Sequence, residues 1–255
     1  MHLGAKVNYF LDTRRLQENA RTIIAKLKAA DATTVIFAGD PLTPIDLTKE
    51  ATAQGYFPEW MVTGIALTDT NFFARQYDPK QWSHGFGIVP GPVRVPQNQF
   101  DGWTLHQWEF GKPPAARASA VLIEAPVLQL FTGIHLAGPH LSAATFRDGL
   151  FRYPPTGGGP TQPRVSWGHH VSGKEEDLGN FDDATEPWFD AKAEGRDEVG
   201  RPGVGMYRWS KGGKRYVRGQ QPDTATDAFD PNGAITGFDQ QPPEDRAPDY
   251  PPPSR

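Results

Sequence analysis

Glycine and aspartate follow directly on a predicted buried strand early in the chain. Residues 33–38 are a β-branched and aromatic run that favours a strand, and Gly39-Asp40-Pro41 comes next. Open parallel sheets bind their ligands at the carboxyl ends of the strands. At that edge Gly39 would let a ligand approach the backbone, and Asp40 would offer a carboxylate to an ammonium or hydroxyl group. The alternative is an ordinary strand-to-helix turn, in which Asp40 caps the following helix.

A second polar loop follows the next predicted strand, at 60–64. It contains Gly64, Thr68 and Asp69. Because the carboxyl ends of parallel strands meet at one edge, we expect this loop and the first one to border a shared ligand-binding cleft. The alternative is again structural, with Thr68 or Asp69 capping a short helix at 68–75.

Other polar clusters lack the spacing that catalysis or metal binding requires. His169-His170 has no third ligand in a recognisable motif, which favours a polar loop. Asp182, Asp183 and Asp190 do not follow the calcium-loop pattern, which favours a solvated acidic loop. There is no nucleophile elbow and no dinucleotide fingerprint after the first strand. We therefore predict no catalytic residue, no metal and no cofactor, and a protein that is not an enzyme.

The first 90 residues supply the elements that must position the two loops. Their pattern is β-α-β-α-β, with strands at 7–12, 33–38 and 60–64 and helices at 16–30 and 43–54. Asp12 ends the first of these strands. Connections of this length are typical of right-handed crossovers in a parallel sheet. The pattern predicts an α/β fold with an open parallel, Rossmann-like sheet that the rest of the chain does not complete.

The remainder of the chain is less regular. Helices are expected at 100–110, 115–136 and 142–150, with a kink or a helix start at Pro126 inside the second of them. Residues 211–216 suggest a hairpin turn between strands at 207–209 and 216–217. The aromatic residues Trp188, Tyr207, Trp209 and Tyr216 form either a satellite core or a surface that binds a sugar or a partner.

Composition narrows the class of partner. The chain has 255 residues, a formal net charge of −4 and a mean hydropathy of −0.56, which does not favour nucleic acid or anionic membranes. It has no cysteine, so disulfides and thiolate chemistry are excluded. A helix that spans a bilayer needs about 20 consecutive apolar residues, and no stretch of this sequence approaches that length. The N-terminus lacks the features of a signal peptide, so we expect any export signal to lie in a missing segment of a longer protein.

Several stretches in a fixed order resemble one family. Residues 34–41, an amphipathic helix, residues 58–64, and later 122–150 and 198–208 are similar to type I periplasmic solute-binding proteins of ABC importers, of the leucine-binding class and with an actinobacterial-like tail. The resemblance covers residues 5–220. It implies a binding module, and not an enzyme, for a small polar solute such as an amino acid or amide. The solute would be held by closure of two lobes, in partnership with a membrane permease.

The resemblance also sets the expected domain boundaries. Residues 1–88 would form the ligand-binding lobe, and 89–153 a crossover and helices that pack on a first lobe missing from this chain. Residues 154–238 would be an irregular extension rich in Gly, Pro and aromatic residues, and 239–255 a disordered tail. The full-length protein would be extracytoplasmic and lipid-anchored, and this chain alone would bind amino acids weakly or not at all.

One alternative from another functional class stays open. A flavodoxin-like enzyme, a hydrolase or oxidoreductase, would use carboxylates that converge at the carboxyl edge of the sheet. Asp12, Asp40 and Asp69 are the candidates for that role.

Overall fold

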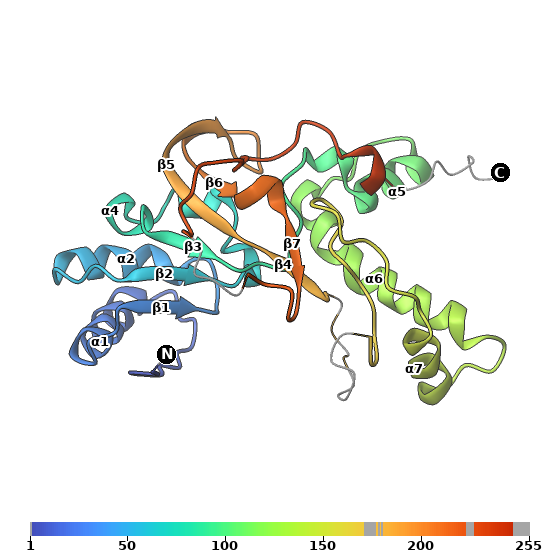
Figure 1. Cartoon of the computed structure of the whole chain (residues 1–255), viewed down its shortest axis with the longest axis horizontal. Coiled ribbons are helices and arrows are strands. Elements are labelled where there is room, and N and C mark those ends of the chain that lie inside the picture. The colour runs from blue at the N-terminus through green and yellow to red at the C-terminus, as the bar shows by residue number, and fades with distance from the viewer. Residues whose placement is uncertain (1, 171–176, 178, 180, 223–226, 247–255) are drawn as a thin grey trace. The chain divides into compact units, whose positions relative to one another are not determined.

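The computed structural model describes residues 2–170, 177, 179, 181–222 and 227–246 (Figure 1). The chain divides into two compact units, each built from segments that lie far apart in the sequence. The first unit comprises Met1–Val89, Glu186–Gly213 and Thr226–Thr236. The second comprises Pro90–Thr185, Lys214–Ala225 and Gly237–Arg255.

The first unit is built on a five-stranded sheet in the order β1-β2-β3-β5-β6. β1 (Thr34–Phe37), β2 (Glu59–Val62) and β3 (Gly85–Gly87) are parallel. β5 (Pro187–Arg196) and β6 (Pro202–Trp209) continue the sheet as antiparallel strands. The prediction of an α/β fold with an open parallel sheet is therefore confirmed, with β1, β2 and β3 as the parallel strands.

Two later strands extend this sheet, within residues 154–238 that were expected to be irregular. β5 and β6 come from a stretch rich in Gly and Pro, which suggested irregular structure. Their turn is instead organised by Asp197, whose carboxylate accepts hydrogen bonds from the backbone N–H groups of Val199 (3.0 Å) and Arg201 (2.8 Å). Glycine in a strand weakens the intrinsic preference but still permits pairing where neighbours bury the backbone.

Helices cover the parallel strands of the first unit (Figure 1). α1 (Leu16–Ala29) and α2 (Thr43–Ala53) pack on each other and bury the apolar stripes that the sequence predicted. A turn η1 (Ile65–Leu67) and two short helices, α3 (Asn71–Ala74) and α4 (Pro79–Trp82), follow β2. The centre of the core consists of side chains with no solvent exposure, which include Trp60, Val62, Trp82 and Tyr207.

Residues 7–12 do not form the predicted strand. They have no ladder partner among the described residues, and Phe10 and Leu11 are exposed. The alternation of apolar residues meets the side-chain requirement of a strand, but a strand also needs a neighbouring backbone to pair with. Tyr9 instead packs its ring on Phe37 of β1.

The second unit contains α-helices of 10, 21 and 9 residues. α5 (Asp101–Phe110) follows a turn η2 (Gln97–Gln99), and α6 (Arg117–Ala137) and α7 (Ala143–Phe151) lie side by side in Figure 1. α6 runs without interruption through Pro126, so that residue neither starts nor ends the helix. α7 begins as predicted at Ser142, whose side chain forms a reciprocal capping box with Thr145.

A two-stranded sheet accompanies these helices. β4 (Asp183–Thr185) pairs antiparallel with β7 (Arg215–Val217). The predicted hairpin between 207–209 and 216–217 was therefore wrong, because β6 and β7 belong to different sheets. The intervening turn η3 (Ser210–Gly213) instead leads from β6, which pairs with β5, to β7, which pairs with β4.

The aromatic residues expected to cover one small core are divided between the units. Trp188, Tyr207 and Trp209 are buried in the main sheet of the first unit, and Tyr216 is buried in the second unit. They are core residues of two separate layers, and not one exposed surface.

Part of the tail expected to be disordered is ordered. A short turn η4 (Pro243–Asp245) places the Asp245 carboxylate where it accepts hydrogen bonds from the backbone N–H (2.9 Å) and hydroxyl (2.7 Å) of Thr161. Residues 247–255 lie outside the described residues.

Candidate functional site

Two loops leave the same edge of the parallel sheet. β1 and β2 are paired in parallel with Phe37 opposite Val62, so the residues that follow them emerge side by side at the carboxyl edge. The two loops, residues 38–43 and 63–70, therefore start from one edge of the sheet, and a shared ligand-binding cleft between 38–40 and 64–69 stays a prediction. Whether the individual side chains face a ligand depends on their own contacts.

The Asp40 carboxylate is fully engaged within its own turn. It accepts hydrogen bonds from the hydroxyl of Tyr9 (2.6 Å), the N–H of Leu42 (2.9 Å), and the N–H (2.8 Å) and hydroxyl (2.7 Å) of Thr43. Burial raises the pKa of Asp40, but these hydrogen bonds outweigh it and leave the pKa below its usual value. Burial and the bond to Asp40 raise the pKa of Tyr9 to about 12. Asp40 thus stabilises the turn between β1 and α2, through its bonds to Leu42 and Thr43.

Gly39 serves the same turn. A Cβ at this position would collide with the Tyr9 hydroxyl, so glycine is required for Tyr9 to reach Asp40. The first loop is therefore held by its own contacts, and few of its hydrogen-bonding groups are left for a ligand.

Asp69 is bonded very differently. It is half-buried, and among the described residues no other group donates a hydrogen bond to its carboxylate. Burial, with a smaller contribution from repulsion by the Glu198 carboxylate, raises its pKa to about 7, although the N–H of Asp69 itself opposes the shift. A carboxyl group with this pKa is partly protonated near neutrality, and it gains most from a donor or cation that the described residues do not provide.

Gly64 gives Asp69 its position. Its φ of +72° is a left-handed conformation that glycine adopts without strain. A Cβ here would lie 2.9 Å from Cβ of Val89 and 3.3 Å from Oδ2 of Asp69. The missing side chain thus lets the Asp69 carboxyl fold back over the end of β2.

Thr68 points into the core. It has no solvent exposure, its hydroxyl donates to the carbonyl of Ile65 (3.0 Å), and its carbonyl accepts from the hydroxyl of Tyr207 (2.9 Å). Thr68 therefore shapes the loop and does not present its hydroxyl to a ligand.

Three residues at this edge were missed by the sequence reasoning. Thr63 directly follows β2, and its hydroxyl is buried with no hydrogen-bond partner in the described part of the chain. Tyr77 is buried and donates to the carbonyl of Pro41 (2.9 Å), and its pKa is raised by burial and by the charges of Asp40, Asp69 and Tyr9. The sequence did contain a signal for Thr63, namely its position at the end of a predicted strand.

The third missed residue, Glu198, comes from the β5–β6 turn. No local pattern connects it to β2. Its position beside the Asp69 loop depends on the pairing of the β5–β6 hairpin with the rest of the sheet.

The remaining polar clusters are paired elsewhere. Asp183 forms an ion pair with Arg215 (2.9 Å), and Asp190 forms one with Arg208 (2.6 Å). Within the described ranges, no three His, Cys, Asp or Glu side chains are grouped so as to hold a metal ion. Asp12 is bonded to Arg14 and ends no strand, so it does not stand at the end of a sheet strand as the enzyme alternative expected.

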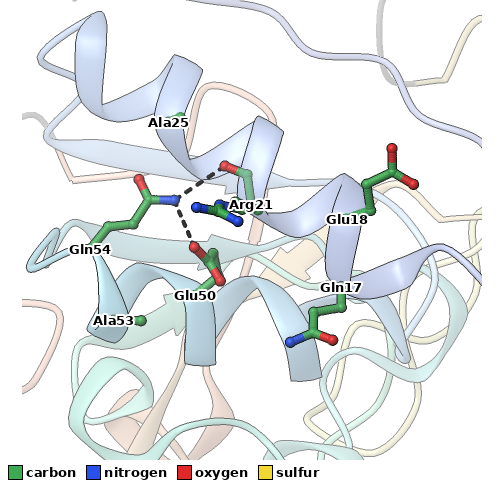
Figure 2. Close-up of a pocket in the computed structure, with 7 residues that line it drawn as sticks. All are labelled: Gln17, Glu18, Arg21, Ala25, Glu50, Ala53 and Gln54. Carbon is green, nitrogen blue, oxygen red and sulfur yellow. Dashed lines mark hydrogen bonds between the residues drawn. The ribbon is translucent and has the colours of Figure 1, made fainter.

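A hollow of about 800 Å³ lies elsewhere in the first unit, between α1 and α2 (Figure 2). Its lining contains no residue of the two edge loops. The Gln54 amide at its rim donates to the Glu50 carboxylate (2.9 Å) and to the carbonyl of Arg21 (3.2 Å). The Gln54 amide of this hollow thus bonds to two other residues of its lining.

In the part of the chain that the structure describes, no helix combines the length and apolar character needed to cross a membrane.

Comparison with known proteins gives matches in structure only. No protein-family model matches the chain, and no curated protein sequence matches it. An ABC transporter substrate-binding protein from Aeropyrum pernix is similar at 13% identity with a TM-score of 0.49, over 84% of this chain and 52% of that one.

Two further structures are similar at lower scores. A leucine-, isoleucine-, valine-, threonine- and alanine-binding protein from Brucella ovis, in a closed conformation, has 12% identity and a TM-score of 0.44 over 89% of this chain and 52% of that one. A fatty acid ABC transporter substrate-binding protein from Thermomonospora curvata has 10% identity and a TM-score of 0.42 over 86% and 50%. The chain spans about half the length of the solved structures that it matches. All three are substrate-binding proteins, the class that the sequence resembles.

Proposed function

We propose that this chain supplies a solute-binding lobe of an ABC importer component and catalyses no reaction. The observation that carries the proposal is the Asp69 carboxyl, half-buried at the carboxyl edge of β2 and without a donor from any other described residue. Parallel sheets bind ligands at this edge. The substrate-binding role named for the three similar structures is extended to this chain as part of the same proposal.

The solute is a small polar molecule that carries an ammonium or amide group, such as an amino acid or an amide. Asp69 pairs with that group, and the buried hydroxyl of Thr63 marks a second polar position at the end of the same strand. Gly39, Asp40, Gly64 and Thr68 form the walls of the site. Asp40 and Thr68 act through the turns that they stabilise, and the glycines through the space that they leave.

Retention of the solute requires a second lobe that closes over this edge. Specific pockets enclose most of a small ligand, whereas a single sheet edge leaves one side of it in water. In the complete assembly, hinge closure would bury the solute, and a membrane permease would recognise the closed form. This role places the protein outside the cytoplasmic membrane, with a lipid anchor on the full-length molecule.

The exposed face of α6 is the proposed contact with that second lobe. Six large apolar side chains are exposed on this helix: Leu128, and a set of five that comprises Ile123, Val127, Leu130, Phe131 (63% exposed) and Ile134. The positions of these five fall on one side of the helix at spacings of three and four residues. A contiguous apolar face of this kind marks an interaction surface.

The proposal has a direct test in the whole chain. Amide resonances are followed by NMR while separate amino acids, their amides and their deaminated acids are added. Compounds with an ammonium group should shift the amides of Gly64 and Asp69, with a dissociation constant of roughly millimolar or weaker, because only one side of the site is present. Binding should strengthen as the pH rises through about 7, because ionised Asp69 binds the cation.

Matched variants make the titration specific. Asp69→Asn removes the charge at the proposed site and should abolish the shifts, whereas Asp31→Asn makes the same change before β1, at the opposite edge of the sheet, and should leave them intact. Shifts that survive Asp69→Asn, or micromolar binding by this chain alone, would contradict the proposal.

A further inference from the structure

The loop that carries Asp69 is held by a segment far away in the sequence. The Glu198 carboxylate lies in the β5–β6 turn and accepts three hydrogen bonds from the residues that follow the loop. Its Oε1 accepts from the N–H (3.0 Å) and the side-chain amide (3.0 Å) of Asn71, and its Oε2 accepts from the N–H of Phe72 (2.9 Å). Charge-assisted bonds of this kind are stronger than bonds between neutral groups.

A buried relay joins this contact to the sheet. The Asn71 side chain has no solvent exposure, and its Oδ1 accepts a hydrogen bond from the N–H of Tyr207 (2.6 Å) in β6. The Tyr207 hydroxyl donates to the carbonyl of Thr68 (2.9 Å) and accepts from Nε1 of Trp82 (3.1 Å). Thr68 and Asn71, on either side of Asp69, are therefore both tied to the β5–β6 hairpin.

The hairpin is itself anchored to the same unit by Arg75. The guanidinium donates to the carbonyls of Gly195 (3.0 Å), Gly203 (3.1 Å) and Gly205 (2.9 Å), on both strands of the hairpin. It also lies 3.9 Å from the carboxylate of Asp197, next to Glu198. The turn that presents Glu198 is thus fixed from both strands and cannot move independently of α3.

We infer that Glu198 is a positioning residue of the sheet-edge site, which holds the residues after Asp69 in place and sets a second carboxylate beside that loop. The inference rests on the proposed role of Asp69 and adds a residue that no local pattern connects to it. Two neighbouring carboxylates make this part of the edge selective for a cationic group and unfavourable for a carboxylate.

Other ionisable groups also act on this carboxyl group. Tyr77, which follows α3, and Tyr207 from β6 interact electrostatically with Asp69, and burial raises the pKa of both phenols. Because both are neutral at pH 7, Glu198 is the group whose charge opposes ionisation of Asp69 there.

The test measures Asp69 and the loop directly, without a ligand. Glu198→Gln keeps the volume and an acceptor oxygen but removes the charge, so the Asp69 pKa, followed by carboxyl-carbon NMR, should fall by roughly one pH unit. Glu198→Ala removes the acceptors, so hydrogen exchange at the Phe72 amide should become roughly ten-fold faster or more. Glu194→Gln, an exposed change in β5, is the matched control and should alter neither quantity.

Each result decides the inference. An unchanged Asp69 pKa in Glu198→Gln, or unchanged exchange at Phe72 in Glu198→Ala, would overturn it. A fall in the Asp69 pKa that is no larger in Glu198→Gln than in Glu194→Gln would also overturn it. No solute is added in these measurements, so they are independent of the amino acid titration. Failure of the titration would contradict the proposed function but not the role of Glu198. Failure of the pKa and exchange measurements would contradict the role of Glu198 but not the proposed function.

Discussion

Replacing Arg215 by methionine tests the polar centre of the second unit. The Arg215 and Asp183 side chains are only 1% and 2% exposed, and their charged atoms are 2.9 Å apart. Arg215 also donates to the carbonyls of Gly91 (2.8 Å) and Pro90 (2.6 Å). It therefore joins β4 and β7 to the segment at which the chain enters this unit.

The expected cost follows from what the change leaves behind. Removing one partner of a buried ion pair costs about 3–5 kcal/mol, because the other charge stays buried without compensation. The carbonyls of Gly91 and Pro90 also lose their donor, and the buried methionine stem offsets part of that loss. We expect Arg215→Met to reduce the free energy of unfolding by about 4 kcal/mol, which lowers the Tm by roughly 8–16 °C.

The assay must report on the second unit. Calorimetry gives the Tm, and hydrogen exchange at the amides of β4 and β7 assigns the transition to this sheet. Adding Asp183→Asn to Arg215→Met removes the uncompensated charge yet keeps an acceptor for the N–H of Arg164, which Asp183 now binds at 3.0 Å. The double variant should therefore be more stable than Arg215→Met.

An exposed ion pair provides the control. Arg147 and Asp148 are 3.0 Å apart with side chains that are 54% and 53% exposed, and Arg147→Met should change stability by no more than about 0.5 kcal/mol. A loss below about 1 kcal/mol in Arg215→Met, or a double variant less stable than the single one, would refute the reasoning.

Two further changes probe the site and the exposed helix. Tyr207→Phe removes the hydroxyl that pairs with the Thr68 carbonyl and with Trp82 Nε1, so urea unfolding should show a loss of about 2–4 kcal/mol, and an unchanged midpoint would show that both groups find other partners. Phe131→Lys should lower the fluorescence of an apolar dye bound to the chain, because Phe131 is a central exposed residue of α6, and equal dye binding would argue against an accessible apolar face.

Local sequence patterns predicted the elements that depend on neighbours in the chain. The apolar stripes of α1 and α2, the β-branched run of β1 and the cap at Ser142 are all local features, and each appeared where expected. Parallel pairing of β1 and β2 followed from the helix that connects them. The edge at which Asp40 and Asp69 emerge was therefore predictable.

Side-chain roles at that edge were not predictable in the same way. Asp40 and Asp69 both follow strands, yet Asp40 is saturated by Tyr9 and its own turn, whereas Asp69 receives no donor from any other described residue. Hydrogen-bond satisfaction depends on which groups the fold brings near, and identical residue types in equivalent places can differ completely in this respect.

The sequence by itself determined the helices, the parallel strands and the edge at which they present polar loops, because periodicity and capping act within a few residues. Only the tertiary structure decided that residues 7–12 stay unpaired, that β5 and β6 extend the sheet, and that Glu198 meets Asn71 across 127 residues. Strand pairing and the burial of charge are settled by contacts between distant segments, and no local pattern encodes them.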